Sequence, residues 1–121
     1  MAKDVTFGWE LVLDLYECDL ATMSSKKKIQ EYTIALCKLL KMQPYGKALI
    51  PYFGLSKPHT KGYSLLQFIE TSSITGHFSE HKRSIYLNIF SCRPYDAQHA
   101  KKFTKEFFGA KRVKWRLMTR I

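Results

Sequence analysis

WELVLDLYEC, residues 9–18, alternates side chains of two kinds along an extended chain. Leu11, Leu13 and Leu15 share one side, while the other side carries polar residues such as Asp14. A period of two residues predicts a strand that buries one face against a core. Segments 62–71, 83–92 and 112–121 are bounded by turn residues and rich in strand formers, so they predict three further strands.

Two segments between these strands have the period of a helix. The first begins after Ser24 or Ser25, either of which can cap it, and Pro44 ends it. Its apolar stripe is Ile29, Tyr32, Thr33, Leu36 and Leu40. The second helix follows Asp96, a good N-cap, and precedes Gly109, which suits a C-terminal cap. Its buried stripe is Ala100, Phe103 and Phe107.

The element order β-α-β-β-α-β predicts an α+β fold in one domain, residues 1–121. We expect a two-layer sandwich, with a mainly antiparallel sheet and both helices on one face. Segment 43–60, with three prolines and two glycines, is expected to be a long loop. The second sheet face would remain too apolar for full solvation, so we infer that a second subunit or a ligand covers it, with the long loop as the alternative. That face carries Val12, Tyr16, Phe68, Tyr86 and Phe90.

The charge is unevenly distributed. The chain has 20 Lys and Arg against 10 Asp and Glu, yet half of the acids lie in its first twenty residues. An acidic first strand could hold a cationic ligand. The basic remainder lacks any recognition-helix, zinc-finger or RNA-binding signature, so we do not expect a nucleic-acid partner.

The three cysteines, with no CxxC spacing, favour reduced thiols over disulfides or a zinc site. No segment has the length and apolarity of a membrane span, and the first residues do not resemble a signal peptide, so we expect a cytoplasmic protein without a membrane partner.

TSSITGH, residues 71–77, is the segment from which chemistry is most expected. Ser64 and Ser72 share one side of an extended chain if no bulge intervenes. Cys92 ends the next predicted strand and could lie on that side. A turn at Gly76 would bring His77 back toward them. A serine, a histidine and a cysteine could therefore converge.

These residues resemble a known family, the small prokaryotic S-adenosylmethionine decarboxylases, which are made as self-cleaving proenzymes. The first strand ends in the similar sequence Tyr16-Glu17-Cys18-Asp19. Without gaps, Ser72 falls on the family's cleavage serine, Ser64 on its upstream serine and His77 on its processing histidine. Cys92 falls on its catalytic cysteine.

The resemblance implies a function and a cofactor. The chain would cleave itself between Thr71 and Ser72, and Ser72 would become a pyruvoyl group that forms a Schiff base with the substrate amine. His77 would act as acid and base, Ser64 would orient the intermediate, and Cys92 would protonate the product. The substrate would be S-adenosylmethionine, used in spermidine synthesis, and the assembly a homodimer. Candidates for substrate binding are Phe7, Trp9 and Glu80.

Departures from the family pattern leave alternatives open. The cleavage serine usually follows glutamate and precedes histidine, but here Thr71 and Ser73 take these positions. Ser73 is therefore a second candidate nucleophile. The chain could instead be a pyruvoyl decarboxylase of a basic amino acid, arginine or ornithine, or an uncleaved homologue that serves as a basic binding module. His77, Glu80 and His81 also spell HxxEH, a zinc peptidase motif that requires a helix and is not favoured here.

Overall fold

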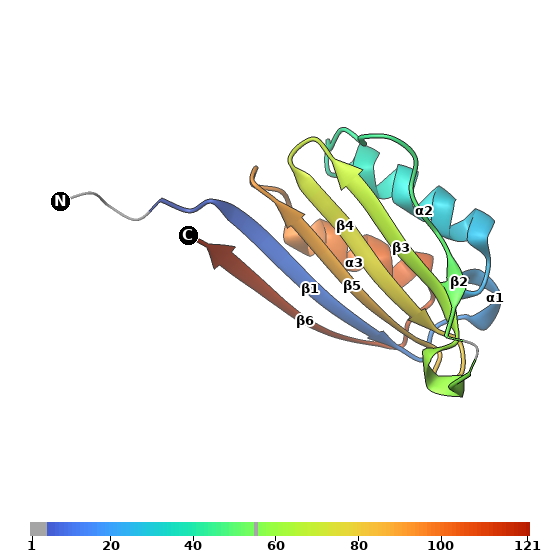
Figure 1. The fold of residues 1–121 in the computed structure, drawn as a ribbon. Helices are drawn as coiled ribbons and strands as arrows, with labels where there is room; N and C mark the ends of the chain where they lie inside the picture. Colours follow the sequence, from blue (N-terminus) through green and yellow to red (C-terminus); the bar gives the residue numbers. More distant parts are fainter. Residues whose placement is uncertain (1–4, 55) are drawn as a thin grey trace.

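The computed structural model describes residues 5–54 and 56–121. Figure 1 shows a six-stranded antiparallel sheet in the order β2-β3-β4-β5-β1-β6. The strands are β1 (Gly8–Tyr16), β2 (Tyr52–Phe53), β3 (Gly62–Ile69), β4 (Ser72–Ser79), β5 (Ser84–Ser91) and β6 (Arg112–Arg120). The helices are α1 (Leu20–Met23), α2 (Lys26–Leu39) and α3 (Ala97–Phe107), with a 3₁₀ turn η1 at Pro58–Thr60.

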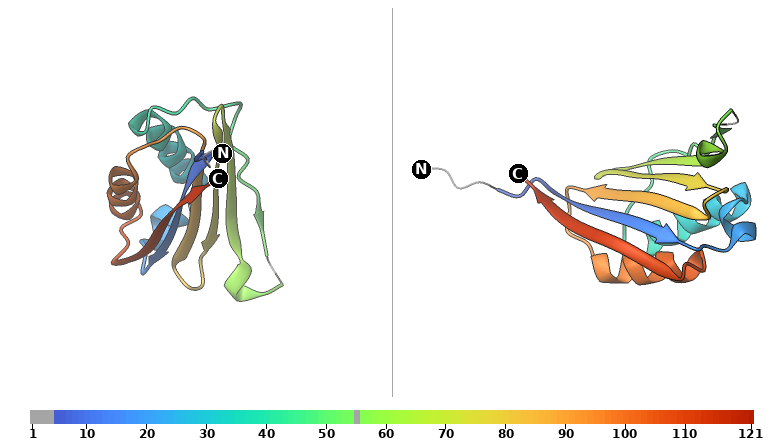
Figure 2. Two further views of the ribbon diagram at one scale, coloured as in Figure 1. Left: turned by 90° about the vertical axis from the view of Figure 1, so that its left-hand side faces the viewer. Right: turned by 90° about the horizontal axis from the view of Figure 1, so that it is seen from below.

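The main helices, α2 and α3, lie side by side on one face of the sheet, as the turned view on the left of Figure 2 shows. The predicted α+β sandwich is therefore confirmed. The opposite sheet face, which we call the open face, is not covered by a helix of the described chain. Among the described residues, no helix is both long and apolar enough to cross a membrane.

The core lies between the sheet and the helices. Leu11, Leu13 and Leu15 are fully buried, as their alternation predicted. Tyr32 of α2 stacks on Phe103 of α3, and its hydroxyl lies 2.7 Å from the buried Thr104 Oγ1. Burial raises the pKa of the Tyr32 phenol well above its ordinary value. This hydrogen bond joins the two helices in the middle of the helix layer.

The helix ends agree largely with the sequence. Ser25 caps α2 by accepting from the Lys28 N–H, and Asp96 caps α3 by accepting from the His99 N–H. Gly109 follows α3 with φ of 62°, the left-handed conformation expected at this position. Helix α2 ends at Leu39, before Pro44, because the chain turns away at Lys41 with φ of 56°.

One prediction about the sheet is wrong. Residues 72–79 form a full strand, β4, and Gly76 lies in its middle, paired with Leu65 on one side and Leu87 on the other. The chain reverses earlier, through Glu70 and Thr71, in a two-residue hairpin. Strand β4 is central in the sheet, and the partner strands on both sides outweigh the low strand propensity of its serines and glycine.

The expected loop is partly ordered against the edge of the sheet. Its backbone bonds to β3 at Tyr45, Leu49 and Pro51, and Tyr52–Phe53 then pairs as β2. The loop therefore extends the sheet beyond β3 and does not cross the open face. That face keeps apolar side chains in contact with solvent, among them Phe68, which is 52% exposed.

Candidate functional site

The hairpin between β3 and β4 holds the predicted cleavage bond. The carbonyl oxygen of Thr71 accepts a hydrogen bond of 3.1 Å from the Cys92 N–H. The Ser72 hydroxyl donates to the same oxygen. The Thr71 carbonyl is therefore polarised by a backbone donor, and the hydroxyl of the next residue lies beside it.

A buried serine that the sequence analysis missed lies beside this turn. Ser91 is the register partner of Ser72 and is only 1% exposed. Its Oγ lies 2.8 Å from Thr71 Oγ1 and accepts a 3.1 Å bond from the Arg93 N–H. The only sequence signal for it was its place directly before Cys92.

A polar cavity of about 430 Å³ opens next to Thr71 and Ser91. It is bounded by the chain that follows α2, by the β3–β4 turn and by the chain from β5 into α3. Its lining includes charged residues of both signs, among them Lys41, Glu70 and Arg93. The cleavage turn is therefore accessible from the helix side of the sheet.

Ser64 and His77 form a second cluster, on the open face. They are register partners on β3 and β4, and Ser64 Oγ lies 3.3 Å from His77 Nδ1. Tyr86 is the next residue in this row, on β5. Because neighbouring strands hold both residues, the pair is fixed by the sheet itself.

The two clusters do not converge within one chain. Ser72 and His77 are five residues apart on one extended strand, which corresponds to about 17 Å. The expectation that Gly76 turns His77 back is wrong, because Gly76 continues the strand. The parity expectation is also wrong, because the turn at 70–71 puts Ser72 in a row with Ile69 and Ser91, whose side chains are buried against the helix layer.

The candidates for substrate binding are separated too. Phe7 is 62% exposed and stacks on Phe90 with ring centroids 6.3 Å apart, at the same end of the sheet as Cys92. Trp9 is half-buried and pairs with Ser91 in register. Glu80 lies at the opposite end of β4, where its carboxylate accepts from the Tyr52 hydroxyl at 3.0 Å. Within one chain, Glu80 is therefore far from Ser72.

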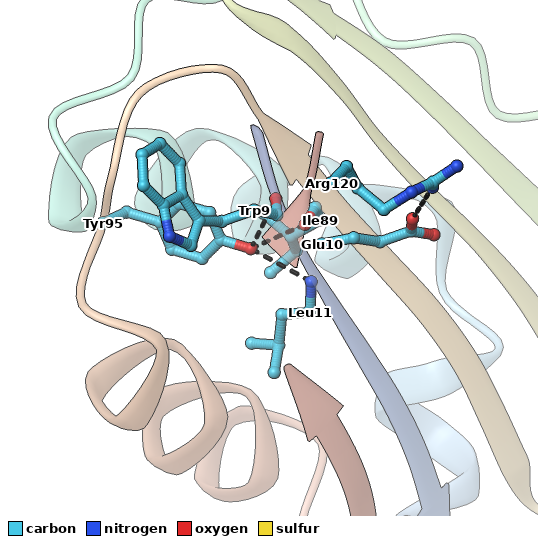
Figure 3. A network of polar contacts seen from close by, with 6 residues as sticks. All are labelled: Trp9, Glu10, Leu11, Ile89, Tyr95 and Arg120. Carbon is cyan, nitrogen blue, oxygen red and sulfur yellow. Dashed lines mark hydrogen bonds and ion pairs between the residues drawn. The ribbon is translucent and has the colours of Figure 1, made fainter. Parts of the chain in front are cut away.

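Tyr95 anchors the segment that follows Cys92 (Figure 3). Its hydroxyl donates to the Ile89 carbonyl at 2.6 Å and accepts from the Leu11 N–H at 3.1 Å. Leu11 and Ile89 are register partners on β1 and β5, so the hydroxyl bridges two strands of the sheet. Burial raises the pKa of this phenol, which therefore remains protonated and can donate.

Two acids of the first twenty residues form ion pairs with arginines of β6. Glu10 accepts from Arg120 at 2.6 Å, as Figure 3 shows, and Glu17 from Arg112 at 3.2 Å. Asp14 is the register partner of Lys114. Arg120 and Arg112 therefore occupy the carboxylates of Glu10 and Glu17, and these two acids give no support to the expected site for a cationic ligand on the first strand.

The helix that the HxxEH alternative needs is not present. His77 lies in β4, whereas Glu80 and His81 lie in the turn that follows it. In the described part of the chain, no group of three or more His, Cys, Asp or Glu side chains could hold a metal ion. The geometry therefore gives no support to a zinc peptidase.

Residues 9–121 match the family model of S-adenosylmethionine decarboxylase. The chain belongs to the S-adenosylmethionine decarboxylase family. Among solved structures, the adenosylmethionine decarboxylase from Aquifex aeolicus VF5 has the same fold, with a TM-score of 0.80 at 18% sequence identity. The alignment covers 95% of this chain and 91% of that one. A search of curated proteins finds no match.

Proposed function

We propose that this member of the S-adenosylmethionine decarboxylase family is a pyruvoyl-dependent decarboxylase that cleaves itself between Thr71 and Ser72. One observation carries the proposal: the Thr71 carbonyl oxygen receives both the Ser72 hydroxyl and the Cys92 N–H. A backbone donor on a carbonyl stabilises the negative charge that develops when a nucleophile attacks it. Ser73, the other candidate nucleophile, would have to attack the Ser72 carbonyl, and within the described chain its hydroxyl makes no hydrogen bond to that carbonyl, whereas the Ser72 hydroxyl contacts Thr71.

The cleavage would proceed in three steps. Ser72 Oγ forms a bond to the Thr71 carbonyl carbon, the C–N bond breaks, and the hydroxyl proton ends on the new amine. A base then removes the Cα proton of Ser72, the Cβ–Oγ bond breaks, and Thr71 leaves as a carboxylate. Tautomerisation of the resulting dehydroalanine, addition of water and loss of ammonia leave a pyruvoyl group at residue 72.

The position of Ser72 fits such a group. Residue 72, the first residue of β4, would become the N-terminus of the second fragment, and β3 and β5 hold it on both sides, so cleavage leaves the sheet intact. The pyruvoyl carbonyl supplies an electron sink for loss of carbon dioxide from an amino acid carboxylate. Cys92 is exposed at the end of β5, opposite Thr71, where its thiol could deliver a proton.

The distance between the clusters supports a homodimer. Ser64 and His77 lie on the open face, far along β4 from Ser72. A two-fold arrangement of two open faces would bring Ser64 and His77 of one copy to the end of the other copy's sheet that carries the Thr71–Ser72 bond and Cys92, where the backbone of Ser72 is approached from the side opposite to its side chain. The apolar residues of the open face, including Phe68, would then be buried. His77 would serve as the base and acid of the elimination, while Ser64 would orient the intermediate.

Aromatic side chains at the Cys92 end suit S-adenosylmethionine. Phe7 and Phe90 form a stacked pair, and Gly8 between them allows it, since a Cβ there would lie 2.9 Å from the Phe90 ring. An exposed ring can stack on adenine, and ring faces attract a sulfonium. These features favour S-adenosylmethionine over arginine or ornithine, neither of which has a flat purine. The product would supply spermidine synthesis.

Release of ¹⁴CO₂ from carboxyl-labelled substrates tests the proposal. Purified protein should release it from S-adenosylmethionine but not from arginine or ornithine, and borohydride reduction of the pyruvoyl group should abolish the release. Release from a basic amino acid alone would assign the alternative activity. An inactive and uncleaved wild-type chain would contradict both decarboxylase activities.

A further inference from the structure

Ser91 connects the cleavage turn to the segment that carries Cys92. It is fully enclosed between β4 and β1, as the register partner of both Ser72 and Trp9. Its hydroxyl bonds to the Thr71 hydroxyl at 2.8 Å and accepts from the Arg93 N–H at 3.1 Å. Both contacts are made to residues that adjoin the proposed reaction, Thr71 by carrying the scissile carbonyl and Arg93 by following Cys92.

The two contacts restrain both the acceptor and the donor of the hydrogen bond from the Cys92 N–H to the scissile carbonyl of Thr71. Thr71 is β-branched, so a bond to its Oγ1 restricts χ1 and, through it, the backbone beside the carbonyl. The bond from the Arg93 N–H restrains the chain directly after Cys92, whose own N–H is the donor to that carbonyl. Ser91 thus restrains both the Thr71 carbonyl and the Cys92 N–H relative to each other.

We propose that Ser91 is a positioning residue for self-cleavage, acting through the Thr71 hydroxyl to keep the Thr71 carbonyl on the Cys92 N–H during attack by Ser72. The inference rests on the proposed function and deepens it. It also accounts for the departure at position 71, because a threonine hydroxyl reaches Ser91 directly. The affected step is the first one, transfer of the Thr71 acyl group from nitrogen to oxygen.

The rate of self-cleavage after synthesis tests this, followed by denaturing mass spectrometry of the full-length chain and its two fragments. Ser91→Ala should slow cleavage by about 10- to 100-fold, the size expected for a small misplacement of reacting groups. Ser91→Thr, which keeps a hydroxyl, should restore most of the rate. Ser84→Ala is the matched control, because Ser84 is another buried serine of β5 at the strand's opposite end, and it should cleave at the wild-type rate.

Two further measurements separate positioning from general destabilisation. Thr71→Val should also slow cleavage, and the double variant should be no slower than Ser91→Ala alone, because Ser91→Ala already removes the bond that Thr71→Val removes. Hydroxylamine, which cleaves esters, should not rescue Ser91→Ala, because the ester does not form. Cleavage of Ser91→Ala at the wild-type rate, additive effects in the double variant, or rescue by hydroxylamine would each overturn the inference alone. A wild-type chain that never cleaves would overturn the proposed function and this inference with it.

Discussion

The Ser64 hydroxyl on β3 lies 3.3 Å from Nδ1 of His77 on the neighbouring strand β4. Ser72 lies five residues before His77, at the start of β4. The sheet holds these positions apart, since an extended strand cannot shorten without breaking its pairs on both sides. The residues that the family resemblance assigns to one reaction therefore form two half-sites in each chain. In the proposed dimer, joined by the open faces, His77 of one copy would approach the backbone of Ser72 in the other.

Complementation between inactive chains tests this arrangement. Ser72→Ala and His77→Ala variants should each remain uncleaved when expressed alone. When they are coexpressed, the His77→Ala chain should be cleaved, because its own Ser72 meets His77 of the other copy. Mass spectrometry identifies which chain is cut, and sedimentation reports whether dimers form. Cleavage that never appears in mixed dimers would show that each chain completes its own site.

His77 is expected to act in the elimination and not in the acyl transfer. A His77→Ala chain should accumulate the ester between Thr71 and Ser72, which has the mass of the uncleaved protein. Hydroxylamine should then cut it rapidly and leave serine at residue 72 and a hydroxamate on Thr71. Histidine 59, which lies in the 3₁₀ turn η1, provides a control, and His59→Ala should process normally. Resistance of the His77→Ala chain to hydroxylamine would place His77 in the earlier step.

Phe7 is expected to bind the adenine of the substrate. Phe7→Ala should raise KM for S-adenosylmethionine by about 10- to 100-fold, because stacking of a base on an aromatic ring contributes about 1–3 kcal/mol. Phe7→Tyr should keep KM near the wild-type value, and self-cleavage should be unaffected in both variants. An unchanged KM in Phe7→Ala would remove Phe7 from the binding site.

Tyr32 gives the fold a specific sensitivity to alkaline pH. Its pKa is raised by burial above the unfolded value of 10.0, so above pH 10 the unfolded chain releases a proton that the folded chain keeps. The free energy of unfolding should therefore fall with rising pH, by about 1.4 kcal/mol per pH unit once the pH is well above 10. Urea unfolding of Tyr32→Phe should lack this contribution. Equal pH profiles for the two proteins would mean that the phenol ionises in the folded state.

The regular parts of the fold could be predicted because each follows from a local rule. The alternation of Leu11, Leu13 and Leu15 set the buried face of β1, and Ser25, Asp96 and Gly109 marked helix ends through short-range hydrogen bonds. Strand β4 could not be predicted in this way, because Ser72, Ser73 and Gly76 have low strand propensity. It is stabilised by pairing with β3 and β5, the strands that directly precede and follow it, and the composition of 72–79 does not reveal this pairing.

The same missed strand explains the error at the site. Placing the turn at Gly76, and not at Glu70 and Thr71, reversed the side on which Ser72 was expected and brought His77 too close. The pair of Ser64 and His77, and the role of Ser91, depend on the register between strands, which a single sequence does not specify. The ion pairs that Arg120 and Arg112 of β6 form with Glu10 and Glu17 also depend on the pairing of β1 with β6, so the sequence alone did not show that these acids have partners.

The mass of freshly purified wild-type protein under denaturing conditions tests the central claim most directly. We predict two fragments, residues 1–71 with a normal carboxylate and residues 72–121 beginning with a pyruvoyl group, and a single intact chain for Ser72→Ala. A wild-type chain that remains intact at 121 residues, or one that is cut at another bond, would contradict the account.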